Sequence, residues 1–200
     1  KYLMASLDQS LRRMHLDYVD LFYSHRFDPA TPVEETLQTL VDIVRMGKAL
    51  YVGISNWPLE PLKIAEKYLR EHEVPLLIYQ GRLNLLQQLP IEQGILDFCR
   101  DRGVGFIAFS PLAQGLLTDR YLNGIPTDSR MAREKFLTSD RLTPEYLNYI
   151  SNLKTEAETQ GKTIAQAALA WVLQQQGVTS VLVGASSVAQ LEMNLKSVAL

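Results

Sequence analysis

A histidine and several small polar side chains follow apolar runs of the sequence, each at the point where a run ends. They are His25, Ser55 with Asn56, Gln80, Ser110, and Gly184 with Ser186. Taken singly, each has a structural explanation, such as a turn residue, a helix cap or a partner for a loop carbonyl. Taken together, they predict amide and hydroxyl groups around one mouth, which suits a flat carboxamide and a phosphate chain. His25 ends the first run, where the active sites of parallel-strand folds collect, and is the first functional candidate.

Aromatic and basic residues extend this candidate site. Phe109 ends the fourth apolar run and can offer a stacking surface to a heteroaromatic ring, or it can belong to the core. Arg120 and Arg130 fall in a long connecting segment, where a guanidinium can bind a phosphate through two hydrogen bonds or remain solvated. The start of the last helix, at Ser186 and Ser187, offers free N–H groups to an anion.

Extended and helical patterns alternate along the chain and position these side chains. Runs that are apolar on both faces predict buried strands at 18–25, 49–56, 75–80, 104–110 and 179–184. Amphipathic spacing predicts helices at 1–14, 31–47, 58–69, 91–103, 144–160 and 163–176, and from 187 onward. Capping boxes are expected at Thr31 with Glu34 and at Ser187 with Gln190. The fold class is therefore α/β with parallel strands, either a doubly wound sheet or a (β/α)8 barrel.

The composition excludes several classes of protein. The chain has 200 residues, 46% hydrophobic and 21% charged, with a formal net charge of -2. No dense Lys/Arg run is present, so nucleic acids are not expected as partners. The single cysteine, Cys99, excludes an internal disulfide framework, and its apolar neighbours predict a buried helix face. No run approaches the roughly 20 apolar residues of a membrane helix, and no signal peptide or linker is evident. We expect one cytoplasmic domain over residues 1–200, without membrane insertion.

Several motifs, in the right order along the whole chain, carry a family resemblance. They are Leu16-Asp-Tyr-Val-Asp20, Ser24-His25-Arg26, Gly47-Lys-Ala-Leu-Tyr-Val-Gly-Ile-Ser-Asn56, Phe109-Ser-Pro-Leu-Ala-Gln-Gly115, Gly124-Ile-Pro126 with Ser129-Arg130, and Gly184-Ala-Ser186 with Gln190 and Asn194. With them the sequence resembles the aldo-keto reductase family, and within it the branch of glyceraldehyde 3-phosphate or methylglyoxal reductases and potassium-channel β subunits. The resemblance implies a (β/α)8 TIM barrel, of which this chain supplies about the last five βα units and lacks the first strands.

The resemblance also implies a reaction, which is the reduction of short aldehydes and ketones, such as methylglyoxal or glyceraldehyde 3-phosphate, by hydride transfer from NADPH. His25 would be catalytic, orienting the carbonyl and assisting proton transfer. The residues implied in NADP(H) binding, from the nicotinamide carboxamide to the adenosine end, are Ser55, Asn56, Gln80, Phe109, Ser110, Pro111, Leu112, Ala113, Gln114, Gly115, Arg120, Arg130, Gly184, Ser186, Gln190 and Asn194. No metal is implied. The implied partner is a small carbonyl substrate, and the branch allows a homo-oligomer.

Two departures from the family pattern bear on these implications. Met193 stands where the family usually places a glutamate before Asn194, which affects the expected adenine contact. The catalytic Asp, Tyr and Lys of the family are expected in strands outside this sequence, so the piece by itself can be inactive. One alternative is a non-catalytic NADP(H)-binding regulatory subunit, like the channel β subunits, which typically carry asparagine where His25 stands. Another is an unrelated doubly wound domain, which is disfavoured because no Gly-rich fingerprint follows any predicted strand.

Overall fold

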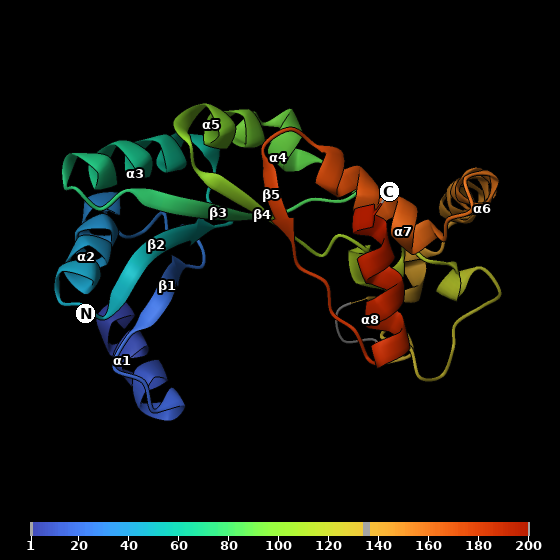
Figure 1. The fold of residues 1–200 in the computed structure, drawn as a ribbon, viewed down its shortest axis with the longest axis horizontal. Helices are drawn as coiled ribbons and strands as arrows, with labels where there is room; N and C mark the ends of the chain where they lie inside the picture. Colours follow the sequence, from blue (N-terminus) through green and yellow to red (C-terminus); the bar gives the residue numbers. More distant parts are fainter. Residues whose placement is uncertain (1, 134–136, 200) are drawn as a thin grey trace. The chain divides into compact units, whose positions relative to one another are not determined.

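The computed structural model describes residues 2–133 and 137–199, in which helices and strands alternate as expected (Figure 1). The first elements are α1 (Tyr2–Met14), β1 (Val19–Ser24), α2 (Val33–Arg45), β2 (Ala49–Ser55), α3 (Leu59–Glu71), β3 (Leu76–Arg82), α4 (Leu89–Glu92), α5 (Ile95–Arg102) and β4 (Gly105–Phe109). The later ones are η1 (Ala113–Gly115), η2 (Asp119–Tyr121), η3 (Ser139–Arg141), α6 (Pro144–Thr159), α7 (Ile164–Gln174), β5 (Val178–Val181), α8 (Val188–Leu195) and η4 (Lys196–Ala199). Each predicted strand is present.

The five strands form a sheet in the order β1-β2-β3-β4-β5, which is also their order in the sequence. β1 pairs with β2, and β2 with β3, in parallel. Helices connect these neighbours, because parallel strands need a crossover rather than a hairpin. The carboxyl ends of β1, β2 and β3 therefore lie at the same edge of the sheet, and the predicted α/β class is confirmed.

The chain divides into two compact units. The first comprises Lys1–Gly81 with Pro90–Ile107, and the second comprises Arg82–Leu89 with Ala108–Leu200. The single domain expected from the sequence stays a prediction. Candidate residues in β1 to β3 belong to the first unit, and those from Phe109 onward belong to the second.

The core of the first unit lies between its strands and helices. Figure 1 shows α2, α3 and α5 on the same side of the strands. Three side chains are fully buried: Leu40 of α2, Leu62 of α3 and Ile54 of β2. Tyr51, on the opposite face of β2 from Ile54, is 47% exposed. The amphipathic spacing predicted for these helices thus matches the side that they bury.

A close contact between β1 and β2 depends on a glycine. Gly53 pairs in register with Tyr23 of β1 and Ile78 of β3. A Cβ at Gly53 would lie 2.6 Å from Tyr23 Cε1 and 3.0 Å from Ile78 Cγ2, so the tyrosine ring rests against the β2 backbone. Burial raises the pKa of Tyr23, and its phenol is protonated near neutral pH.

Two local details differ from the expectations. Thr31 Oγ1 donates to Asp28 Oδ2 at 2.8 Å, and α2 begins without a side-chain cap, so the capping box predicted at Thr31 is wrong. The helix predicted at 91–103 is divided into α4 and α5, because Gly94 adopts a φ of 71° between them. At α8, Ser187 Oγ accepts from Gln190 N at 3.2 Å, as predicted for a cap, but the capping box is incomplete because Gln190 Oε1 accepts from Ser186 N rather than from Ser187 N.

Cys99 lies on the buried side of α5, as predicted. Its thiol is free and has no exposed surface. Burial raises the pKa of Cys99 to about 12, so the thiol is protonated near neutral pH and packs as a small apolar side chain.

The burial pattern of α3 can be tested by truncating side chains on its two faces. We expect Leu62→Ala to lower the free energy of unfolding by about 2–5 kcal/mol, because Leu62 is fully buried and its loss leaves a cavity. The matched control is Ile64→Ala on the same helix, where the side chain is 47% exposed and we expect a loss of under about 1 kcal/mol. Denaturant unfolding of the full-length protein, followed by circular dichroism, measures both, and equal losses would contradict the assigned burial.

Candidate functional site

The carboxyl ends of β1, β2 and β3 meet at one residue, Asn56. Asn56 Nδ2 donates to the carbonyl oxygen of His25 at 3.4 Å and to Ser55 Oγ at 2.9 Å. The backbone N–H of Asn56 donates to the carbonyl oxygen of Gln80 at 3.4 Å. The structure therefore brings together the predicted residues of these strands. The His25 side chain is exposed, Ser55 is buried and Gln80 is half-buried.

The backbone at Asn56 is held in an unusual conformation. Its φ is 55°, in the left-handed region, which asparagine tolerates better than most residues. The next residue, Trp57, is 2% exposed, and its carbonyl oxygen accepts from Tyr79 Oη at 2.8 Å. Phe27 packs edge-on against the indole, with ring centroids 5.1 Å apart. A buried aromatic anchor thus fixes the turn that presents the Asn56 amide.

The segment after β4 carries a second group of predicted residues in the second unit. Ser110, Ala113 and Gln114 have φ values of 53°, 47° and 62°. Non-glycine residues in this region each cost of order 1–3 kcal/mol and persist only where the surroundings hold them. Such clusters of backbone strain occur at ligand-binding and active sites.

A buried asparagine, Asn84, holds this strained segment. Asn84 has no exposed surface, its Nδ2 donates to the Ser110 carbonyl at 2.9 Å, and its Oδ1 accepts from Leu86 N at 3.0 Å. The neighbouring N–H of Leu83 donates to the carbonyl oxygen of Phe109 at 3.4 Å. The segment that follows β3 therefore positions the segment that follows β4.

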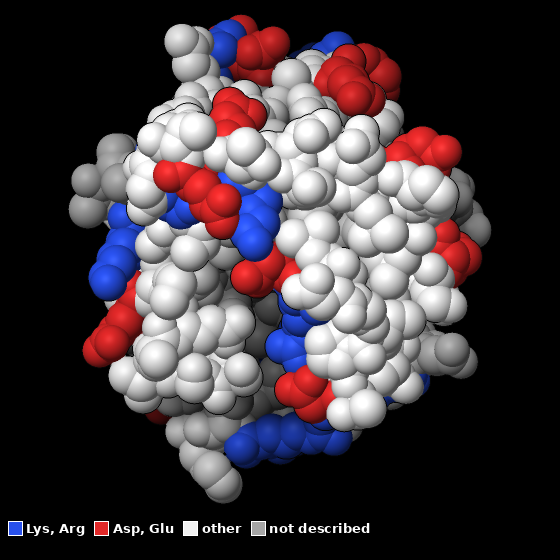
Figure 2. Space-filling view, turned by 90° about the vertical axis from the view of Figure 1, so that its right-hand side faces the viewer, with Lys and Arg blue, Asp and Glu red and all other residues white. Residues whose placement is uncertain are grey.

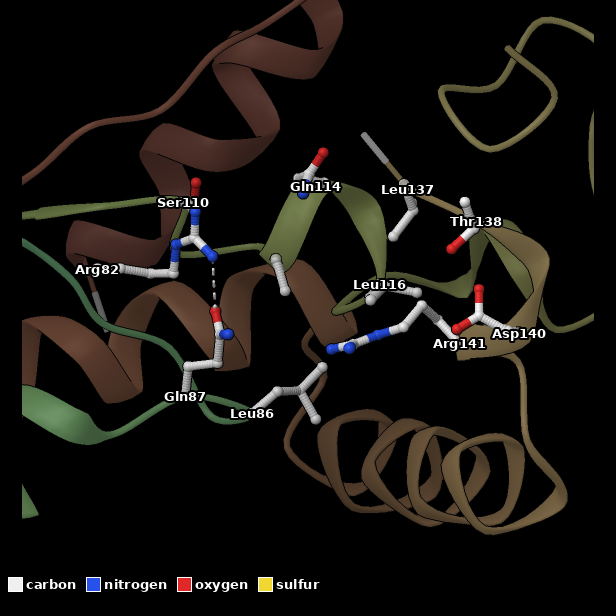
Figure 3. Close-up of a pocket in the computed structure, with 11 residues that line it drawn as sticks. Arg82, Leu86, Gln87, Ser110, Gln114, Leu116, Leu137, Thr138, Asp140 and Arg141 are labelled. Atoms are coloured by element: carbon white, nitrogen blue, oxygen red, sulfur yellow. Dashed lines mark hydrogen bonds between the residues drawn. The ribbon is translucent and has the colours of Figure 1, made fainter. Parts of the chain in front are cut away.

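A pocket of about 260 Å³ lies within the second unit beside this segment (Figure 3). Three of its lining residues, Ser110, Ala113 and Gln114, were predicted from the sequence. The other polar lining residues are Arg82, Gln87, Thr138, Asp140 and Arg141. The apolar ones are Leu86, Leu116 and Leu137.

The apolar wall of the pocket is fixed by a half-buried tyrosine. Tyr146 Oη donates to the Leu116 carbonyl at 2.6 Å. Burial, and to a smaller extent the nearby Tyr121, raises the pKa of Tyr146 to about 12, so the phenol remains a donor near neutral pH. Leu116, Tyr121 and Leu137 belong to one buried apolar cluster with Met131.

The other residues of the long connecting segment that were predicted to bind the cofactor do not line this pocket. Arg120 forms an ion pair with Asp128, with Nη2 and Oδ1 2.9 Å apart, and Arg130 is exposed. Pro111 is buried, and Leu112 and Gly115 are half-buried. The phosphate-binding roles of the two arginines stay predictions.

The start of α8 gathers the last predicted group. Gln190 Oε1 accepts from Ser186 N at 2.7 Å and from Ser186 Oγ at 3.0 Å, while Gly184 is exposed. Asn194 is 4% exposed, and its Nδ2 is buried without a hydrogen-bond partner among the described residues. A buried donor without a partner is costly, and a ligand acceptor would satisfy it.

The surface charge is mixed. Figure 2 shows Lys and Arg side chains interspersed with Asp and Glu on the face turned to the viewer. Within residues 2–133 and 137–199, no cluster of three His, Cys, Asp or Glu side chains is placed to bind a metal ion. None of the helices in the same residues is long and apolar enough to cross a bilayer.

The sequence interpretation missed Arg82, Asn84, Gln87, Thr138 and Arg141. Asn84 had a detectable signal, because it is a polar residue inside the apolar run from Leu83 to Leu86. The others are ordinary polar residues of connecting segments. Only the folded chain brings them to one pocket.

Comparison with known proteins gives the family. The model of the aldo/keto reductase family matches residues 1–200. The chain belongs to the aldo/keto reductase family. This confirms the resemblance carried by the motifs from Leu16 to Asn194.

Three relatives of this aldo/keto reductase chain extend the comparison. L-glyceraldehyde 3-phosphate reductase of Escherichia coli (strain K12) is 53% identical over 98% of this chain and 58% of its own length. A probable voltage-gated potassium channel subunit beta of Arabidopsis thaliana is 35% identical over 99% of this chain and 62% of its own. The crystal structure of a thermostable aldo-keto reductase in complex with the inhibitor epalrestat is similar to this chain, with a TM-score of 0.73. The two sequences are 30% identical, and this chain covers 61% of the crystallised chain.

The aldo/keto reductase chain therefore spans less than two thirds of the length of these relatives. Its structural neighbour is a (β/α)8 barrel, and the five parallel strands with alternating helices supply part of that barrel. The predicted fold class is confirmed.

The role of Asn84 in holding Ser110 can be tested by truncation. Asn84→Ala leaves the Leu86 N–H without its partner and removes one of the two hydrogen bonds to the Ser110 carbonyl, which also accepts from Ala113 N at 2.9 Å, so we expect the free energy of unfolding to fall by about 1–3 kcal/mol. Limited proteolysis of the full-length protein should also become faster between residues 110 and 116. The control, Asn152→Ala on the exposed surface of α6, should change neither quantity measurably. An unchanged cleavage rate in Asn84→Ala would show that other contacts hold the segment.

Proposed function

We propose that the whole protein reduces short aldehydes and ketones, such as methylglyoxal or glyceraldehyde 3-phosphate, with NADPH as the hydride donor. The observation that carries this proposal is the 53% identity to an L-glyceraldehyde 3-phosphate reductase. The polar side chains at the ends of β1 to β3 support it, because carbonyl reduction needs groups that orient a carboxamide and a carbonyl.

The described residues have the chemistry to hold NADPH. Amide and hydroxyl groups of Ser55, Asn56 and Gln80 suit a carboxamide, and the Phe109 ring suits a heteroaromatic ring. Segment 110–115 would hold the diphosphate, and the buried, unpartnered Asn194 Nδ2 fits an acceptor at the adenosine end. When bound, NADPH supplies the hydride and carries the redox chemistry.

His25 has the position and chemistry of a group that acts on the substrate carbonyl. It follows β1 directly, its side chain is exposed, and its backbone carbonyl is held by Asn56. Negative charge develops on the carbonyl oxygen during reduction, so a donor beside that oxygen stabilises the transition state. An imidazole can donate a hydrogen bond and can carry a proton near neutral pH.

The second candidate is a non-catalytic NADP(H)-binding regulatory subunit. The 35% identity to a probable voltage-gated potassium channel subunit beta favours it. We give it the lower rank because the identity to the reductase is higher. A regulatory subunit should bind NADPH yet turn over methylglyoxal and other short aldehydes slowly, which an absorbance assay of NADPH oxidation detects.

The proposal includes a cytoplasmic location, a small carbonyl substrate as partner, and no nucleic acid or membrane partner. The free, buried Cys99 is compatible with a reducing compartment. A homo-oligomer is compatible with the proposal.

The role of His25 is tested by His25→Asn in the full-length protein. We expect kcat/KM for methylglyoxal to fall by roughly 10²-fold or more, because the donor to the developing oxyanion is weakened and the proton carrier is lost. The dissociation constant of NADPH, measured by fluorescence quenching, should change by less than about threefold, because the backbone carbonyl that Asn56 contacts remains.

The matched control is His15→Asn, since His15 is exposed and has a left-handed φ of 55° that asparagine tolerates. It should keep the full turnover rate. Unchanged turnover in His25→Asn would remove the histidine from the reaction, and slow turnover in the unaltered protein would favour the regulatory subunit.

A further inference from the structure

One asparagine of the chain is followed directly by a glycine. It is Asn123, which precedes Gly124 in the second unit, just after η2. Every other asparagine precedes a bulky side chain, in the pairs Asn56-Trp57, Asn84-Leu85, Asn148-Tyr149, Asn152-Leu153 and Asn194-Leu195. The step from Asn123 to Gly124 therefore differs chemically from the other five.

An asparagine followed by glycine can react with its own backbone. The glycine nitrogen attacks Cγ of the asparagine side chain, a new C–N bond closes a succinimide ring, and the side-chain nitrogen leaves as ammonia with the proton of the glycine N–H. Water then opens the ring at either carbonyl, which gives aspartate or isoaspartate. Water is the one co-reactant, and nothing is oxidised or reduced. Glycine favours the attack because it has no Cβ to hinder its nitrogen or restrict its backbone.

The structure leaves both reacting groups accessible. Asn123 and Gly124 are exposed, and the Asn123 side chain makes no hydrogen bond to any part of the chain that the structure describes. The Gly124 N–H donates to the Tyr121 carbonyl at 3.4 Å, beyond the roughly 2.7–3.2 Å typical of such bonds. A Cβ at Gly124 would meet nothing within 4 Å, so the space around this nitrogen is open.

Other asparagines are protected by their surroundings. Asn84 has no exposed surface, and both ends of its amide are hydrogen-bonded. Asn152 is exposed, but it lies inside α6, where helical hydrogen bonding engages the backbone N–H of the next residue. Exposure, a weakly held nitrogen and a following glycine thus coincide at Asn123.

We propose that Asn123 is a site of spontaneous deamidation, at which the side chain converts to aspartate or isoaspartate. Either product adds a negative charge close to the ion pair between Arg120 and Asp128. Isoaspartate also adds one carbon to the main chain, within a turn closed by the hydrogen bond from Leu122 N to the Asp119 carbonyl. The inference is independent of the proposed function.

Mass spectrometry of the aged full-length protein tests the proposal. The protein is incubated in mildly alkaline heavy-oxygen water and digested, and we expect the fragment carrying Asn123 to exchange its amide nitrogen for a heavy oxygen as time passes. The rate should lie within about tenfold of that of a free peptide with the sequence of residues 119–128, because an exposed turn protects little. A slower rate would show that the whole protein shields this step and would overturn the proposal.

The fragments with Asn84 and Asn152 are internal controls, and both should stay unchanged over the same period. Gly124→Ala should slow the reaction about tenfold or more, because a Cβ hinders the attacking nitrogen. An equal rate in this variant would contradict the mechanism.

A second variant keeps the glycine, and with it the backbone of the turn, whose φ at Gly124 is 107°. Asn123→Gln retains an uncharged amide but would have to close a larger and less favourable ring. Ion-exchange chromatography should show an acidic form that accumulates in the unaltered protein and not in Asn123→Gln. Equal accumulation in both proteins would place the charge change elsewhere and overturn the assignment.

Discussion

The buried amide of Asn84 is the contact on which the second half of the candidate site depends. It donates to the carbonyl of Ser110 and accepts from the N–H of Leu86, so both ends of the amide are satisfied inside the protein. These bonds hold a segment in which Ser110, Ala113 and Gln114 adopt left-handed backbone conformations. The strain is tolerated because hydrogen bonds from the buried Asn84 side chain define one conformation, and the same residues then line the pocket.

An analogous amide organises the first unit. Asn56 contacts the backbone of His25 and Gln80 and the hydroxyl of Ser55, and so links the ends of three strands. Its side-chain amide donates to the His25 carbonyl and the Ser55 hydroxyl, and its backbone N–H donates to the Gln80 carbonyl, so one residue serves acceptors at all three strand ends. Parallel pairing brings the strand ends to one edge, and the amide converts that edge into a defined set of polar groups.

Family membership and pocket chemistry contribute different parts of the functional argument. In the proposed function a cofactor carries the redox chemistry, so the protein's part would be to position, orient and select. Members of a fold family differ most in the segments that connect its strands. Arg82 and Arg141 lie at the ends of β3 and η3, where such segments begin or end, and they give the pocket a positive charge that the fold itself does not require.

The sequence by itself determined the alternation of strands and helices, the polar residues that end the strands, the Ser187 cap and the burial of Cys99. Each follows from periodicity or from chemistry between near neighbours. Local reasoning was wrong at Thr31, because Asp28 competes for the hydroxyl, and at residues 91–103, because Gly94 adopts a left-handed φ. Only the tertiary structure decided that Asn84 holds Ser110 and that Arg82 and Arg141 share a pocket. Those residues are distant in the chain, and no local pattern encodes a contact that exists only after the segments pack.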